Sequence, residues 1–193
     1  GLYVEPSIRA GRVTATPGLR ADAIVIGSGY GGTVIDPRLT VSVEASDSVT
    51  VEAATGRWSR MPQARKLVAP LGTPSLTAAH SIQNVLGVSW QPSSSWEWKS
   101  SVYVNLLSDV VVGREDAFSF TDPVVLGPTD TEPWRNEGEG RIMGVESMLK
   151  WRNRRTFVWL TGTVSRSERR DDALDWHPYG YDQPLNLIAL VSH

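Results

Sequence analysis

Hydrophobic and polar residues alternate at period two along most of this chain. In the clearest stretch, from Trp96 to Leu106, tryptophan, valine and leucine share one face, and Glu97, Lys99, Tyr103 and Asn105 share the other. Such alternation predicts β-strands with one apolar face. Similar alternation marks 2–10, 13–25, 39–45, 49–53 and 143–151, and less regular strand-like stretches cover 81–90, 156–165 and 184–192. We therefore expect an all-β, antiparallel protein of about nine strands, most of them close to the ~10 residues of a tilted membrane-spanning strand.

The connections between these stretches are alternately short and long. Tight hairpin turns are expected at 11–12, 46–48, 92–95 and 153–155, and longer connections at 27–35, 58–80, 109–140 and 167–183. Outer-membrane barrels have short periplasmic turns and long extracellular loops. A soluble β-sandwich has no reason to keep this strict order. The pattern therefore predicts an antiparallel transmembrane β-barrel segment.

Aromatic residues flank the short turns. Trp90, Trp96 and Trp98 surround one of them, and 151–159 contributes Trp151, Phe157 and Trp159 beside another. Tryptophan concentrates at membrane interfaces because it combines an apolar ring with a polar edge. The alternative is that these rings anchor the core of a soluble β-sandwich or jelly-roll binding module, which should fold without detergent. Both interpretations stay open at this point.

Composition excludes several classes of function. The 193 residues carry Lys+Arg 19 against Asp+Glu 21, so no basic excess favours nucleic acid, and with Cys 0 there is neither a disulfide scaffold nor a thiol nucleophile. The 3 histidines are too scattered for a metal motif. The acidic loop 109–140 and the pair Asp171 and Asp172 are explained as solvated charges. We expect no catalytic residues, no metal ligands and no cofactor, and so no enzyme.

One glycine motif suggests a different function. The stretch Ala21–Gly32 resembles an apolar strand followed by G-x-G-x-x-G, with Gly27, Gly29 and Gly32 in the spacing that cradles a dinucleotide pyrophosphate. That site needs a helix and a crossover of a dozen or more residues, and the next alternating stretch begins too soon, at Leu39. We interpret the glycines as a loop tip. A flavin or nicotinamide oxidoreductase remains the less favoured alternative.

Four short segments carry a family resemblance. They occur in a fixed order along the chain: Asp36-Pro37-Arg38-Leu39, Gly144-Val145-Glu146, 165–170 and Tyr181-Asp182-Gln183-Pro184. Together with the turn pattern they resemble the barrel of bacterial TonB-dependent outer-membrane receptors. The likeness runs from about Val13 to the end and is strongest from Gly140 to Val191.

The resemblance implies a location and partners. It implies a protein of the bacterial outer membrane that contacts lipid, binds a small molecule such as a metal chelate, and reaches the TonB complex through a plug domain. Because an odd number of about nine strands cannot close a bacterial single-chain barrel, we expect residues 1–193 to be a central part of the barrel. The absence of an initial Met favours a chain that begins inside a longer product, with the plug and the other strands elsewhere. A porin-like channel or an adhesin barrel stays open.

Alternation alone selects the residues that should face the barrel lumen. They are the larger polar side chains opposite the apolar face: Arg20, Glu44, Glu52, Lys99, Tyr103 and Glu146.

Overall fold

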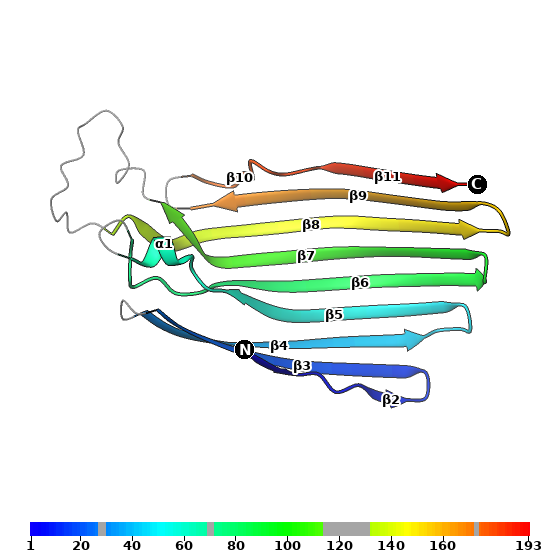
Figure 1. The fold of residues 1–193 in the computed structure, drawn as a ribbon, viewed down its shortest axis with the longest axis horizontal. Helices are drawn as coiled ribbons and strands as arrows, with labels where there is room; N and C mark the ends of the chain where they lie inside the picture. Colours follow the sequence, from blue (N-terminus) through cyan, green and yellow to red (C-terminus); the bar gives the residue numbers. More distant parts are fainter. Residues whose placement is uncertain (27–29, 69–71, 114–131, 172–173) are drawn as a thin grey trace.

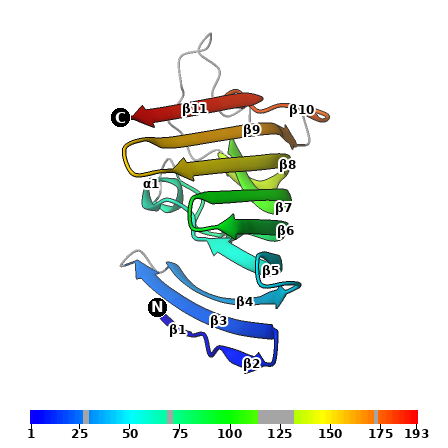
Figure 2. The ribbon, with the colours of Figure 1, turned by 90° about the vertical axis from the view of Figure 1, so that its right-hand side faces the viewer.

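The computed structural model describes residues 1–26, 30–68, 72–113, 132–171 and 174–193 and contains a single 11-stranded antiparallel sheet (Figure 1). Viewed from one end, the strands are stacked in one curved layer that does not close (Figure 2). The strands are β1 (Leu2–Val4), β2 (Ile8–Ala10), β3 (Val13–Ile26), β4 (Tyr30–Glu44), β5 (Val49–Arg60), β6 (Ala79–Ser93), β7 (Trp96–Gly113), β8 (Trp134–Arg152), β9 (Phe157–Arg170), β10 (His177–Pro178) and β11 (Leu185–Ser192). A four-residue helix, α1 (Ala64–Leu67), lies between β5 and β6.

From β3 to β9, each strand pairs with the strands that precede and follow it in the chain. β1 and β2 both pair with β3, and β10 and β11 both pair with β9, so the two outermost strands are interrupted. Pro6, which has no backbone N–H to donate, lies in the first interruption. The nine stretches expected from alternation therefore correspond to seven continuous strands and two broken ones.

Several boundaries differ from those predicted. β4 begins at Tyr30, not Leu39, and Ile26 pairs with Tyr30, so the long connection expected over 27–35 is wrong. The face that packs inward on this part of β4 carries Tyr30 and Val34, which blurs the apolar–polar alternation. Gly32 lies in the strand, where the dinucleotide motif requires a helix. Gly27 and Gly29 lie outside the described residues.

Register separates the sheet into an apolar face and a polar face. Ala53, Leu86, Val102, Val145 and Val164 are aligned across β5 to β9. The adjacent row on the opposite face comprises Glu52, Gly87, Ser101, Glu146 and Thr163. Side chains of the first row are substantially exposed, with Val102 at 48%. Outer-membrane barrels have the same division, with an apolar face toward lipid and a polar face toward the lumen.

Tryptophans gather on the apolar face at the short-turn end. Trp90, Trp96, Trp98 and Trp151 have the register of that face, and the Trp96 and Trp151 rings lie 5.9 Å apart. Trp159 instead pairs with Lys150 on the polar face, where the Lys150 ammonium lies 5.7 Å from its ring centroid. Of these five tryptophans, only the first four lie on the apolar face, where the interfacial belt predicted from the sequence would lie.

The main buried apolar cluster lies at the long-loop end of the sheet. We call residues 61–68 and 72–78, which include α1, the cap. Leu67 and Leu76 from the cap pack with Tyr30 of β4, and the partly buried Ile24, Val111 and Trp134 surround them. The Trp134 amide donates to Thr73 Oγ1 at 3.1 Å, which ties the cap to β8. Among the described residues no helix is long and apolar enough to span a bilayer.

Candidate functional site

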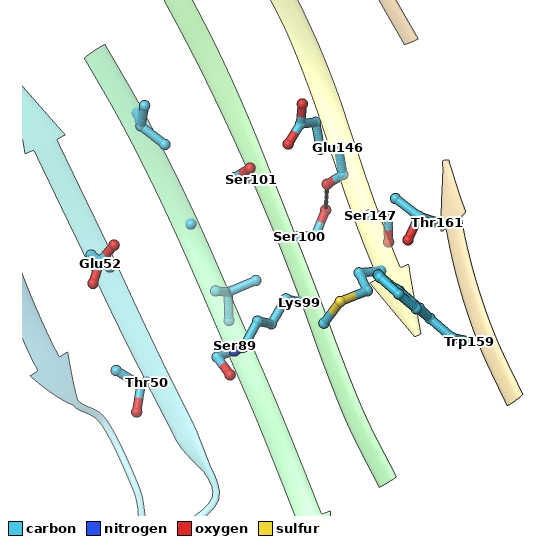
Figure 3. Close-up of a pocket in the computed structure, with 14 residues that line it drawn as sticks. Thr50, Glu52, Ser89, Lys99, Ser100, Ser101, Glu146, Ser147, Trp159 and Thr161 are labelled. Atoms are coloured by element: carbon cyan, nitrogen blue, oxygen red, sulfur yellow. Dashed lines mark hydrogen bonds between the residues drawn. The ribbon is translucent and has the colours of Figure 1, made fainter. Parts of the chain in front are cut away.

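The polar face of β5 to β9 contains a hollow of about 620 Å³ (Figure 3). Small side chains create this space, because Gly87, Ser89, Ser101 and Thr161 occupy positions where larger residues would fill it. Glu52 of β5 and Glu146 of β8 lie on its sides, as Figure 3 shows. The hollow is open, and its lining combines charged and hydroxyl groups with apolar side chains such as Val85, Met148 and Trp159, which suits water or a docked segment.

Charges are arranged unevenly around this hollow. Toward the short turns, the Glu97 carboxylate accepts the Lys99 ammonium at 2.7 Å and the Lys150 ammonium at 3.4 Å. Within the described part of the chain, neither the Glu52 nor the Glu146 carboxylate forms an ion pair. These two carboxylates are therefore free to bind cations or basic groups that enter the hollow.

The structure places all six predicted lumen residues on the polar face and gathers four of them. Glu52, Lys99 and Glu146 line the hollow, and Tyr103 lies beside it, across Gly144. The other two are distant on the same face. Arg20 pairs with Asp22 at 2.5 Å, and Glu44 pairs with Arg9 at 2.8 Å.

A second hollow, of about 590 Å³, lies at the long-loop end and was missed by sequence reasoning. Its lining includes several hydrogen-bond donors: Arg60, Gln83, Asn105, Arg169, His177 and Tyr179. The Arg169 guanidinium lies 4.5 Å from the centroid of the Tyr179 ring and donates to the Glu168 carbonyl at 2.9 Å. Alternation from Thr163 could have placed Arg169 on the polar face, but the contribution of Tyr179 depends on the path of the last long loop.

An Asp–Ser–His contact beside this hollow has a structural explanation. The β4–β5 ladder ends at the Arg38–Gly56 pair, and beyond it the Asp36 carboxylate accepts the Ser59 amide at 2.9 Å and the Ser59 hydroxyl. The hydroxyl also lies 2.9 Å from Nδ1 of His80. In a hydrolytic triad the imidazole lies between serine and acid, whereas here the serine lies between them. Asp36 therefore replaces a missing ladder bond.

The cap contains one lysine with a shifted pKa. Burial of Lys66 lowers its pKa, and repulsion from the nearby Arg65 and Arg60 lowers it further; its ammonium lies 4.2 Å from the Trp134 ring centroid. No group of three or more acidic or histidine side chains among the described residues is placed to hold a metal ion.

Comparison with known families identifies the chain. The family model described as TonB dependent receptor-like, beta-barrel matches residues 1–188. The chain belongs to this family. TonB-dependent receptors are bacterial outer-membrane receptors and transporters and are not enzymes, so membership favours the barrel over the soluble-sandwich and oxidoreductase alternatives. No curated protein sequence matches the chain.

Several solved structures of transporters and receptors share the fold of this chain. The FrpB iron transporter from Neisseria meningitidis (F3-3 variant) is 15% identical with a TM-score of 0.69, over 88% of this chain and 25% of that one. A mutant of the ferric enterobactin receptor PfeA from Pseudomonas aeruginosa is 15% identical with a TM-score of 0.66, over 98% and 35%. The copper transporter OprC is 16% identical with a TM-score of 0.64, over 89% and 28%. The chain thus spans about a quarter to a third of these receptors.

Proposed function

We propose that this chain forms part of the wall of an outer-membrane receptor that takes up a scarce ligand, such as a metal chelate, with energy supplied through TonB. The observation that carries the proposal is the pair of hollows on the polar face of a TonB-dependent receptor barrel. One lies near the long loops, where a ligand would enter. The other lies farther along the same face, beside strands that would enclose the lumen and its plug.

The lining of the loop-end hollow carries Arg60, Arg169 and Arg170 against Glu139 and Asp171, and this excess of one positive charge favours an anionic ligand. Guanidinium groups from Arg60 and Arg169 and amides from Gln83 and Asn105 are donors that match carboxylate, catecholate or phosphate oxygens. The Tyr179 ring adds an apolar contact. The names of FrpB, PfeA and OprC, which refer to iron, ferric enterobactin and copper, support a metal-containing ligand.

The orientation of the wall is part of the proposal: Arg20, Glu44, Glu52, Lys99, Tyr103 and Glu146 face the lumen. The 193 residues contain Cys 0, so a single cysteine introduced here is the only one in this part of the wall, and labelling of the unmodified intact receptor gives the background. A membrane-impermeant thiol reagent should modify Glu146→Cys in open outer-membrane fragments and leave Val104→Cys unmodified. Modification of Val104→Cys from water would overturn this orientation.

Uptake can be tested directly with defined metal probes. The intact receptor would be expressed in cells that lack other receptors, and accumulation of a ferric catecholate, a ferric hydroxamate and copper(II) would be compared. Arg169→Gln should weaken binding of the transported probe about tenfold, because a charge-assisted hydrogen bond is lost. Arg154→Gln, in the exposed turn at the other end, is the matched control and should change nothing.

Removal of TonB distinguishes energised uptake from a passive channel. Accumulation should then stop, while binding of the metal probe at the cell surface continues. Accumulation that persists without TonB would contradict the proposal and favour the porin-like alternative.

A further inference from the structure

The apolar face carries a charged cluster at its long-loop end. It comprises Arg141, Arg166, Glu168 and Arg170 together with Glu139 and Trp176. Of these, Glu139 and Arg170 also line the loop-end hollow, and the proposed function does not use the other four. Glu168 is only 3% exposed, and its carboxylate receives the guanidiniums of both Arg141 and Arg166, the latter at 2.5 Å. This arrangement fixes two basic side chains with one acid.

The cluster has one more positive charge than negative. The Arg170 guanidinium pairs with Glu139 at 2.7 Å, and the single Glu168 carboxylate serves two guanidiniums. The side chain of Arg166 remains 66% exposed despite its ion pair. Trp176 lies between two of the basic groups, with its ring centroid 4.3 Å from Arg141 and 5.1 Å from Arg170.

Register places this charge at the border of the apolar band. Val145 pairs with Val164, the next outward pair along the strands is Met143 with Arg166, and the pair beyond that is Arg141 with Glu168. In the other direction, the apolar residues continue to Trp151 and Val158 near the short turn. Arg166 therefore lies where the lipid-facing surface meets the outer aqueous phase, the depth at which lipid phosphates are found.

Below Arg166 the apolar face is hollowed. A groove of about 540 Å³ is formed where β8 and β9 carry Ser147 and Gly162 between the larger Trp98, Leu149, Leu160 and Leu187. The Trp98 indole donates to Ser147 Oγ at 2.9 Å, which satisfies two polar groups that would otherwise meet lipid. The groove is thus apolar and largely closed to hydrogen bonding from an occupant.

The distance between the groove and the charged cluster is short enough for one lipid molecule to reach both. Gly162 and Arg166 are four residues apart on β9, which is about 13 Å along a strand. Half of the hydrocarbon thickness of a bilayer is about 15 Å. An acyl chain that begins at a phosphate on Arg166 would therefore reach the groove before it reaches the opposite leaflet.

We propose that this surface is a specific site for a phosphate-bearing lipid of the outer leaflet, with the phosphate on Arg166 and Arg141 and one acyl chain in the groove at Gly162. Glu168 holds the two guanidiniums in place before the lipid arrives. The inference depends on the outer-membrane location, but not on which ligand is transported.

Titration of the intact, detergent-solubilised receptor with bis-phosphorylated lipid A, followed by native mass spectrometry, tests the site. Arg166→Gln should weaken binding about fivefold. Gly162→Leu should weaken it about tenfold, because the added side chain fills the space of a few methylene groups. The matched controls, Arg155→Gln in the short turn and Ala53→Leu elsewhere on the apolar face, should bind like the unmodified protein. A heat-dependent gel shift checks that each variant is folded.

Dephosphorylated lipid A and inorganic phosphate separate the two halves of the site. Dephosphorylated lipid A should bind the unmodified receptor about fivefold more weakly, and Arg166→Gln should then have no further effect. Inorganic phosphate alone should not compete at equal concentration. Equal binding of both lipids, an unchanged affinity in Gly162→Leu, or effective competition by inorganic phosphate would each overturn the proposal. Because the readout is lipid binding, these outcomes are independent of any failure of uptake.

Discussion

Hydrophobic side chains are buried in the cap and exposed on the apolar face of the strands. In the cap, Leu67 is 0% exposed and packs against Leu76 and Tyr30, as in a water-soluble domain. On the strands, Val102 is 48% exposed, and its neighbours in the same row are equally open. A soluble monomer rarely exposes a continuous apolar surface of this extent. The two regions therefore suit different surroundings. The cap suits water, and the apolar face of the strands suits lipid.

The largest expected loss of stability comes from a charge placed on the apolar face of the strands. Val102→Arg would place a guanidinium in the apolar band and should destabilise the folded barrel by about 2–4 kcal/mol. Ser101→Arg, one residue away, enters the polar face and should cost less than about 1 kcal/mol. Urea unfolding of the intact receptor in lipid vesicles measures both. Equal losses at the two positions would contradict the assignment of the faces.

A smaller effect is expected in the cap. Leu67→Ala removes its most buried side chain and should lower the local stability of the cap by about 2 kcal/mol, while the strands stay folded. Faster amide hydrogen exchange over 61–68 and 72–78, with unchanged exchange in β8, is the expected result. Val68→Ala is the control, since Val68 is 44% exposed and its truncation should change exchange little. Exchange that rises throughout the strands would show that cap and wall are not separate units.

The smallest expected loss of stability comes from a substitution at a glycine that Tyr103 covers on the polar face. A Cβ at Gly144 would lie 2.6 Å from Cζ of Tyr103 and 2.8 Å from the Val164 carbonyl oxygen. Gly144→Ala should therefore displace the Tyr103 ring and cost about 1 kcal/mol in urea unfolding. At Gly87 the nearest atom would be 3.5 Å away, so Gly87→Ala should be neutral. Equal midpoints for the two variants would mean that Tyr103 does not cover Gly144.

The strands and their faces were predictable from local pattern, whereas contacts between distant segments were not. Alternation from Trp96 to Leu106 identified β7 and the face of Lys99 and Tyr103, because period two is a property of a single strand. The start of β4 at Tyr30 was missed, since that end of the strand packs apolar side chains on its polar face.

Sites that form only when two strands align in a particular register could not be predicted from the sequence either. The Arg141–Glu168 pair is 27 residues apart in sequence and meets only because β8 and β9 are aligned at those positions. A shift of β9 by one residue relative to β8 would have moved Glu168 to the other face, away from Arg141. The cap likewise depends on contacts of Leu67 and Leu76 with Tyr30 and Trp134, which no periodicity indicates.

The strand order has a consequence for how the wall forms. Since every ladder joins segments that are neighbours in the chain, no strand has to wait for a partner from a distant part of the sequence. Each new hairpin brings its own hydrogen-bond partners and extends the sheet from its last edge, so loop-closure entropy is small at every step. Growth by successive hairpins would leave only the two outer edges of the sheet unpaired at each step.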